Sequence, residues 1–346
     1  MSALFAVLFH GIGGLAAGSF YVPFRRVRGW SWESYWLVNG VFAWLLMPWL
    51  VVLAMVPHWE RLMQSAPANV ILSCFGFGLL WGIGGLTFGM TMRYLGVSLG
   101  MAVALGFCAA FGTLVPMLQQ GQLGFLVTQA SGLATLGGVA LCVVGIALCG
   151  QAGMLKEREL SPSQQRATVA EFHLGRGLLV AVVSGLLSAC FAFGLAAGKP
   201  LASLALAEGT PNLWQNSVAF VFIMGGGFTT NLLWCTFLHA RNRSSGDYVD
   251  TQKPLANNYL FSGMAGVIWY SQFMFYGFGS TYLGTYDFAG WTLHMAFIIV
   301  FSTLWGLQLG EWQGCGRHTL KRLATGLALV VLSTVVIGLA AKLGKA

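Results

Sequence analysis

An acid and an imidazole stand out in the apolar stretch YLGTYDFAGWTLHM, residues 282–295. On a helix, Asp287, Trp291 and His294 would lie at positions i, i+4 and i+7, so that a carboxylate, an aromatic face and an imidazole share one stripe. Ionisable residues inside a membrane span are costly and mark ion or proton pathways. We therefore expect Asp287 and His294 to couple to protons and Trp291 to line a binding site for a small solute.

Each of these residues also has a purely structural interpretation. Asp287 follows Gly284 closely, and an acid is favoured at a helix N-terminus by the helix dipole, so its carboxylate can equally serve as a cap at the outer interface. His294 can be a packing residue with its hydrogen bonds satisfied. His10, which precedes the Gly-rich segment GIGG, is a further candidate for the binding site with the same alternative.

A second set of polar and aromatic residues suits a hydroxylated solute. Trp269, Gln272 and Tyr276 would share one helical face. Amide groups bind sugar hydroxyls, and aromatic faces pack against C–H surfaces. Asn231, in the segment GGGFTTN, is another candidate. The alternative is an aromatic packing stripe and, for Asn231, a hydrogen bond between helices.

The composition requires a membrane environment for the elements that carry these residues. The chain has 346 residues, of which 57% are hydrophobic and 8% charged, with a mean hydropathy of +0.73. An average soluble domain is about one-quarter charged. We therefore predict an all-α integral membrane protein. Ten apolar runs approach the length of about 20 residues that a span needs: 4–24, 36–56, 70–92, 97–118, 131–150, 177–197, 213–237, 259–280, 286–309 and 322–341.

The basic residues predict the orientation of these spans. The net charge is +8, but Lys and Arg lie in short loops between apolar runs, which is a membrane pattern and not a nucleic-acid footprint. The loops on one side hold 14 of the 18 basic residues, and the other side, with both termini, holds 4. The positive-inside rule places both termini outside the cytoplasm.

An internal repeat indicates how the chain is organised. Residues 78–96 and 266–284 align without a gap at an offset of 188 residues, with matches that include Trp81/Trp269 and Gly78/Gly266. The copies fall in the third and the eighth predicted spans, an odd offset of five, so the halves would be inverted across the membrane, as in many secondary transporters. We predict a first five-helix repeat at 1–150, a cytoplasmic linker at 151–176 and a second five-helix repeat at 177–346.

Sequence motifs for other kinds of chemistry are missing. The sequence has no Walker A or dinucleotide fingerprint, no HExxH and no CxxC. Its 7 cysteines lie mostly in apolar runs, as small buried residues do. We therefore expect no cofactor, no bound metal and no enzymatic activity.

Short motifs along the whole chain resemble one transporter family. They include FYVPFRRVRGWSWE (20–33), TMRYLGVSLG (91–100), AGMLKERE (152–159), WYSQFMFYGFG (269–279) and YDFAGWTLHM (286–295). Together they resemble the L-rhamnose–proton symporter family, a ten-span branch of the drug/metabolite transporter superfamily. The resemblance implies proton-coupled uptake of L-rhamnose, a neutral 6-deoxyhexose, by a multi-pass protein of the bacterial inner membrane. The alternative is an exporter or porter of another small metabolite in that superfamily.

Overall fold

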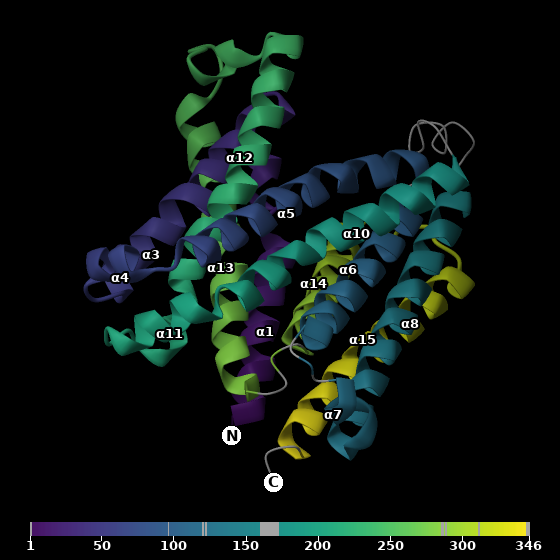
Figure 1. The fold of residues 1–346 in the computed structure, drawn as a ribbon. Helices are drawn as coiled ribbons and strands as arrows, with labels where there is room; N and C mark the ends of the chain where they lie inside the picture. The colour runs from purple at the N-terminus through teal and green to yellow at the C-terminus, as the bar shows by residue number, and fades with distance from the viewer. Residues whose placement is uncertain are drawn as a thin grey trace. The chain divides into compact units, whose positions relative to one another are not determined.

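The computed structural model describes residues 2–95, 97–119, 121, 123–159, 173–284, 287, 289–310 and 312–343. The regular structure of these residues is helical throughout, without a strand (Figure 1). Eight segments of this described part are long and apolar enough to cross a membrane. The prediction of an all-helical chain with membrane-crossing helices is therefore confirmed.

Most of the chain lies in long helices that coincide with the predicted apolar runs. In chain order they are α1 (Ser2–Ser19), α5 (Ala68–Leu95), α6 (Val97–Gln119), α8 (Ala130–Glu159), α10 (Leu174–Ala197), α12 (Ser217–Asn242), α13 (Leu255–Leu283), α14 (Ala289–Gln308) and α15 (Arg317–Leu343). The run 36–56 is formed by α2 (Trp32–Gly40), the π-helical stretch η2 (Val41–Leu46) and α3 (Met47–Met55). The short elements are η1 (Pro23–Arg26), α4 (Trp59–Ser65), α7 (Leu123–Thr128), α11 (Lys199–Ala207), η3 (Asn212–Trp214) and η4 (Ser245–Tyr248).

Two of the predicted spans and the predicted linker differ in detail. The runs 97–118 and 259–280 are helical, as α6 and α13, but they are not among the eight candidate spans. Polar side chains such as Asn258 and Gln272 lower the hydropathy of α13. The first nine residues of the predicted linker 151–176 continue α8 to Glu159, and residues 160–172 lie outside the described part.

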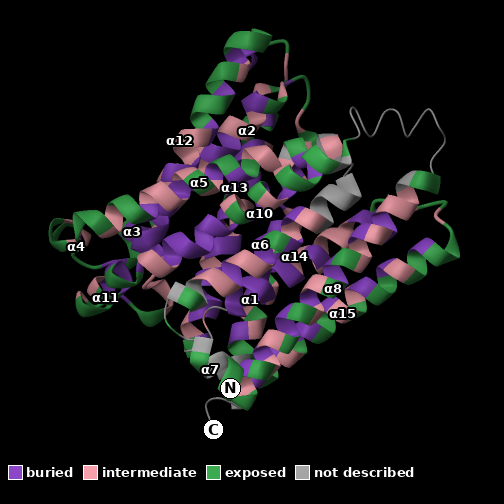
Figure 2. Ribbon diagram, turned by 45° about the vertical axis from the view of Figure 1, so that its right-hand side comes forward, coloured by how far each residue is buried: buried purple, intermediate pink, exposed green. Residues whose placement is uncertain are grey.

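The helices form two compact units, each built from several parts of the chain. Unit 1 comprises Met1–Leu15, Gly84–Ala192 and Gly279–Ala346, and unit 2 comprises Ala16–Ile83 and Phe193–Phe278. In unit 1, α8 packs along α15 and α6, and α14 packs on α6 and α15. In unit 2, α12 packs on α2, η2, α3 and α11. The outward faces of helices such as α8 and α15 carry exposed residues (Figure 2), many of them large apolar side chains, as helices in lipid require.

Glycines allow α8 and α15 to pack closely in opposite directions. A Cβ atom on Gly138 would lie 2.6 Å from Ile337, and one on Gly145 would lie 2.9 Å from the backbone oxygen of Gly326 and from the backbone nitrogen of Val330. Residue numbers therefore rise along α8 as they fall along α15. Small residues at such contacts allow backbones to approach and gain dispersion energy that lipid cannot supply.

The C-terminal end of α8 is fixed to the N-terminal end of α15. The Glu159 carboxylate accepts hydrogen bonds from the Gly316 backbone N–H at 2.8 Å and from the Thr319 hydroxyl at 2.6 Å. The hydrogen bonds from Thr319 and Gly316 lower the pKa of Glu159. A carboxylate at a helix N-terminus is also favoured by the dipole of α15.

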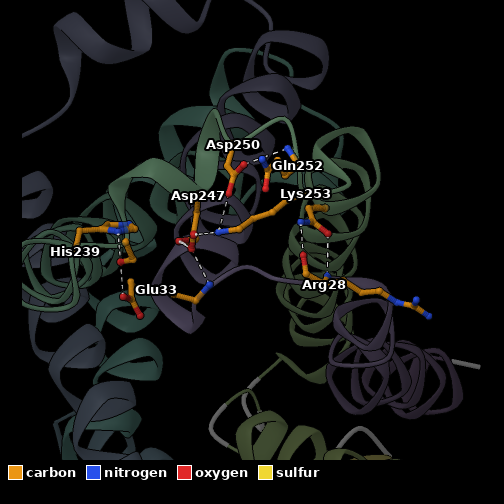
Figure 3. Close-up of polar contacts among 11 residues, drawn as sticks. Arg28, Glu33, His239, Asp247, Asp250, Gln252 and Lys253 are labelled. Carbon is orange, nitrogen blue, oxygen red and sulfur yellow. Dashed lines mark hydrogen bonds and ion pairs between the residues drawn. The ribbon is translucent and has the colours of Figure 1, made fainter.

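A polar junction joins the start of α2 to the end of α12 and the segment that follows it in unit 2 (Figure 3). The Asp247 carboxylate accepts hydrogen bonds from the Ser31 backbone N–H (2.7 Å), the Ser34 hydroxyl (2.6 Å) and the Lys253 ammonium (2.7 Å). Burial raises the pKa of Asp247, but the hydrogen bonds from Lys253, Ser34 and Ser31 outweigh burial and lower it from 3.8 to about 2.

Glu33 forms the second half of this junction. Its carboxylate accepts hydrogen bonds from the Ser244 hydroxyl at 2.5 Å and the Asn242 amide at 3.0 Å. The His239 ring contacts the Ser244 hydroxyl through Nδ1 and the Tyr248 hydroxyl through Nε2, both at 2.8 Å. These bonds satisfy buried polar groups at the end of α12.

We expect Gly145→Ala to weaken the packing of α8 on α15. The added methyl group meets backbone atoms, so the helices must separate, at a cost of about 1–3 kcal/mol. The measurement is thermal unfolding of the purified protein in detergent. Gly137→Ala, on the same helix with open space at its Cβ position, is the matched control and should keep or raise the melting temperature. Equal melting temperatures for both variants would contradict this account of the packing.

Asp247→Asn should destabilise the protein in a pH-dependent way. The pKa of Asp247 is lower in the folded protein than in the unfolded chain. The stability that its carboxylate contributes is therefore complete above the unfolded-state pKa and is lost as the pH falls toward the folded-state pKa of about 2. At pH 7 the variant should lose about 2 kcal/mol of unfolding free energy. Its melting temperature should approach that of the wild type as the pH falls below about 4. Asp250→Asn, whose side chain is 38% exposed, is the control and should differ little from the wild type at any pH.

Candidate functional site

Three of the predicted site residues lie together in unit 1. His10 on α1 and His294 on α14 are both completely buried, and their ring centroids are 6.3 Å apart. The Trp291 ring, 2% exposed, lies 6.3 Å from the His294 ring. The structure thus brings His10 into one cluster with Trp291 and His294, which lie more than 280 residues later in the sequence.

Glycines make room for the His10 ring. A Cβ atom on Gly279 would lie 2.7 Å from His10 Nε2, and one on Gly290 would lie 3.0 Å from the same atom. Gly279 lies in the last two turns of α13, and Gly290 lies in the first turn of α14. A side chain at either position would displace the imidazole, so both glycines are needed for His10 to occupy this position.

Trp291 is held firmly by its neighbours in unit 1. Its Nε1–H donates a hydrogen bond to the Cys108 carbonyl at 3.0 Å, and its ring stacks on Phe191 at 6.0 Å between centroids. Gly112 on α6 lies against the indole, because a Cβ atom there would come within 2.2 Å of Cδ1. The next residue of each helix adds a contact, because the Thr113 and Thr292 hydroxyls share a hydrogen bond of 2.6 Å. The orientation of the indole is therefore fixed by α6 and α14 together.

Asp287 lies outside the helix that carries Trp291 and His294. It occupies a turn before α14, which begins at Ala289, and it is half-buried. Its carbonyl oxygen accepts a hydrogen bond from the Gly290 backbone N–H at 2.9 Å. The predicted helical stripe from Asp287 to His294 is therefore wrong, since the turn that starts at Gly284 delays the helix.

The second predicted set lies in unit 2, where Trp269 joins other tryptophans. The Trp269 ring is 5.1 Å from Trp44 and 5.5 Å from Trp81, and Trp44 is 6.0 Å from Trp36. We call these four residues, from α2, η2, α5 and α13, the tryptophan cluster. Phe273 extends it, at 4.8 Å from Trp269.

The other predicted residues of unit 2 have different surroundings. Gln272 and Tyr276 are buried on α13, at 5% and 3% exposure. The Asn231 amide on α12 bonds within the protein: its oxygen accepts from the Trp36 indole N–H at 3.1 Å, and its nitrogen donates to the Gly227 carbonyl at 2.8 Å. This is the hydrogen bond between helices that the alternative interpretation of Asn231 predicts.

Sequence reasoning did not single out Trp36, Trp44 or Trp81 as site residues. The segment WLVNGVFAW places Trp36, Gly40 and Trp44 at intervals of four, which also fits ordinary helix packing. Gly40 is required because a Cβ atom there would lie 2.8 Å from the Trp44 ring. The sequence therefore contains a Trp–Gly–Trp spacing that could have indicated these residues. It places Trp44 in the cluster only because residues Val41–Leu46 form a π-helical turn.

These arrangements suit binding and proton transfer of a simple kind. Two buried imidazoles offer nitrogen atoms that can accept and donate a proton, and indole and amide groups offer surfaces for an uncharged solute. Within the described residues, no group of three or more His, Cys, Asp or Glu side chains is placed to hold a metal ion.

Comparison with known proteins gives one consistent result. The family model for the L-rhamnose-proton symport protein (RhaT) matches residues 1–342. The L-rhamnose-proton symporter of Cronobacter sakazakii is 38% identical over 337 residues, which cover 96% of each chain. The symporter of the same name from Mannheimia succiniciproducens is 36% identical over 342 residues, or 98% of each chain.

A solved crystal structure shares the fold of this chain. It is 16% identical in sequence, covers 97% of this chain and 98% of its own, and has a TM-score of 0.52. At this identity the likeness concerns the fold alone. The family model and the full-length relatives show that the chain belongs to the L-rhamnose-proton symport protein family.

Proposed function

We propose that this protein is a secondary active transporter that takes up L-rhamnose together with protons across the bacterial inner membrane. The observation that carries the proposal is the full-length match, at 36–38% identity, to proteins named L-rhamnose-proton symporters. The structure is compatible with this role, because it combines membrane-crossing helices with buried imidazoles and aromatic clusters. Transport, and not catalysis, is the activity of the family.

The proton would be carried by residues of unit 1. His294 is buried in α14, close to His10, and Asp287 lies in the turn before that helix. Acids and histidines inside membrane proteins form the proton relays of pumps and transporters, because their side chains can accept and release a proton. We assign proton coupling to His294 and Asp287, with His10 and Trp291 beside them as substrate-binding residues.

We also assign roles in substrate binding to residues of unit 2. Trp269 offers an aromatic face, and Gln272 and Tyr276 offer hydrogen-bonding groups on the same helix. Asn231 contributes by orienting the Trp36 indole, through the hydrogen bond between them. L-rhamnose is uncharged, so neutral side chains of this kind can bind it without a buried counter-charge.

We propose further that ten spans form two inverted five-helix repeats, 1–150 and 177–346, joined by a cytoplasmic linker at 151–176. Inversion requires the fifth helix of each half, α8 and α15, to run in opposite directions, and they do so along their contact. The repeat aligns Trp81 with Trp269. Their ring centroids lie 5.5 Å apart, as those of two residues beside a two-fold axis would.

The glycines of the repeat support the same symmetry. A Cβ atom on Gly78 of α5 would meet the Ile223 carbonyl of α12, and one on Gly266 of α13 would meet the Asn39 carbonyl of α2. Under the proposed repeat, α2 and α12 are counterparts. Each glycine therefore faces the second helix of the opposite half.

Adding L-rhamnose to de-energised cells that express the protein should make the medium more alkaline. Each sugar that enters would carry a proton with it, and no other driving force is present. The pH of a weakly buffered suspension is recorded with a glass electrode, and cells without the protein are the control. A pH rise with a different sugar, and none with L-rhamnose, would retain proton coupling but change the substrate; no rise with any sugar would contradict symport.

Asp287→Asn and His294→Gln should separate proton coupling from sugar movement. Without coupling, a carrier only equilibrates its sugar, so the accumulation ratio should fall to about 1 while counterflow of labelled L-rhamnose continues. Asparagine caps helices about as well as aspartate. A normal accumulation ratio in Asp287→Asn would therefore show that Asp287 serves as a cap. Normal ratios in both variants would contradict the assignment of proton coupling.

A further inference from the structure

Among the described residues of unit 2, several buried polar atoms have no hydrogen-bond partner, and they lie on segments that also contribute to the tryptophan cluster. Asn39, at the end of α2, is completely buried, and neither its amide nitrogen nor its amide oxygen has a partner. The Trp44 indole nitrogen, in a residue 4% exposed, and the Tyr270 hydroxyl, in a residue 1% exposed, are likewise unpaired. Buried polar groups are almost always hydrogen-bonded in native proteins. Four such atoms on three neighbouring segments therefore call for an occupant that can bond to them.

Helix packing places the segments that carry these atoms beside one another. Gly266 of α13 lies against the α2–η2 segment, since a Cβ atom there would come 2.5 Å from the Asn39 carbonyl oxygen. Trp269 and Tyr270 follow Gly266 by three and four residues, one helical turn later. The Trp269 ring then meets the Trp44 ring at 5.1 Å and 84°, edge to face.

The backbone conformation of this segment is unusual, and it serves to position Trp44. Residues Val41–Leu46 form a π-helical turn, a feature that occurs frequently at functional sites. The Trp44 ring folds back over Gly40, where a side chain would collide with it. The segment thus brings the indole into the cluster but leaves its N–H without a partner, which packing alone would not favour.

The chemistry of this set of groups fits a sugar ring. All of these amide, indole and hydroxyl groups are uncharged, so they suit a neutral ligand better than an ion. Flat indole faces of Trp44, Trp81 and Trp269 can pack against the C–H face and the methyl group of a deoxyhexose. The Asn39 amide both donates and accepts hydrogen bonds, and the Trp44 indole donates one, so each can bond to a sugar hydroxyl.

We propose that Asn39 and Trp44 bind the hydroxyls of L-rhamnose, and that the faces of Trp81 and Trp269 form the apolar side of the same site. The assignment rests on the proposed function, because it adopts L-rhamnose as the substrate. It adds residues of α2, η2 and α5 to the residues of unit 2 that the sequence predicted, which lie on α12 and α13 alone.

The test is equilibrium binding of labelled L-rhamnose to the purified full-length protein in detergent. Trp44→Phe keeps an aromatic ring but removes the indole N–H, and Asn39→Leu keeps a similar volume but removes both amide groups. Each should weaken binding at least about tenfold, the effect of roughly one lost hydrogen bond to a ligand. Trp49→Phe, on α3 beside Trp59, is the matched control and should bind like the wild type.

Thermal stability separates a binding role from a structural one. If the Asn39 amide is reserved for the sugar, Asn39→Leu should melt no lower than the wild type without L-rhamnose, since it removes unpaired buried groups. A lower melting temperature would show that the amide supports the fold and would overturn the assignment. Unchanged binding in both variants would also overturn it but leave the transport function intact. A wild-type protein that binds no L-rhamnose would contradict the proposed function together with this site.

Discussion

The absence of water around most of the chain is the constraint on which the rest of the structure depends. In lipid, a backbone or side-chain polar group must find its hydrogen bond within the protein. The described chain meets this demand with helices, with glycine contacts such as Gly145 against α15, and with a few internal side-chain bonds such as that of Asn231 to Trp36. Polar groups that lack such a bond are therefore informative, because the constraint leaves few reasons for keeping them.

Part of this arrangement was predictable from the sequence. Apolar runs fix the helices, since only a helix satisfies so long a run of backbone in lipid. Trp291 and His294 lie on one helix as expected, because a period of 3.6 residues needs no tertiary information. The position of Asp287 was not predictable in the same way: the chain turns after Gly284, and only tertiary packing decides where α14 begins.

The tryptophan cluster marks the limit of prediction more clearly. Trp36, Trp44 and Trp81 are spaced as packing residues are, and no pattern in the sequence announces the π-helical turn at Val41–Leu46. The contact of Trp81 with Trp269 joins residues nearly 190 positions apart, so it depends on the fold. The alignment of residues 78–96 with 266–284 pairs the same two residues, and local periodicity holds no such information.

Gly78 and Gly266 lie in equivalent positions of the proposed repeats, yet the carbonyls they face belong to Ile223 and Asn39. One partner is apolar and the other carries a buried, unpaired amide. If the two halves descend from one ancestral gene, the close helix contact is the inherited part and the amide is a later acquisition or a remnant kept on one side only. A symmetric ancestor would have presented the same surface twice. Divergence at a single position of this contact is enough to give a neutral, asymmetric solute one preferred orientation.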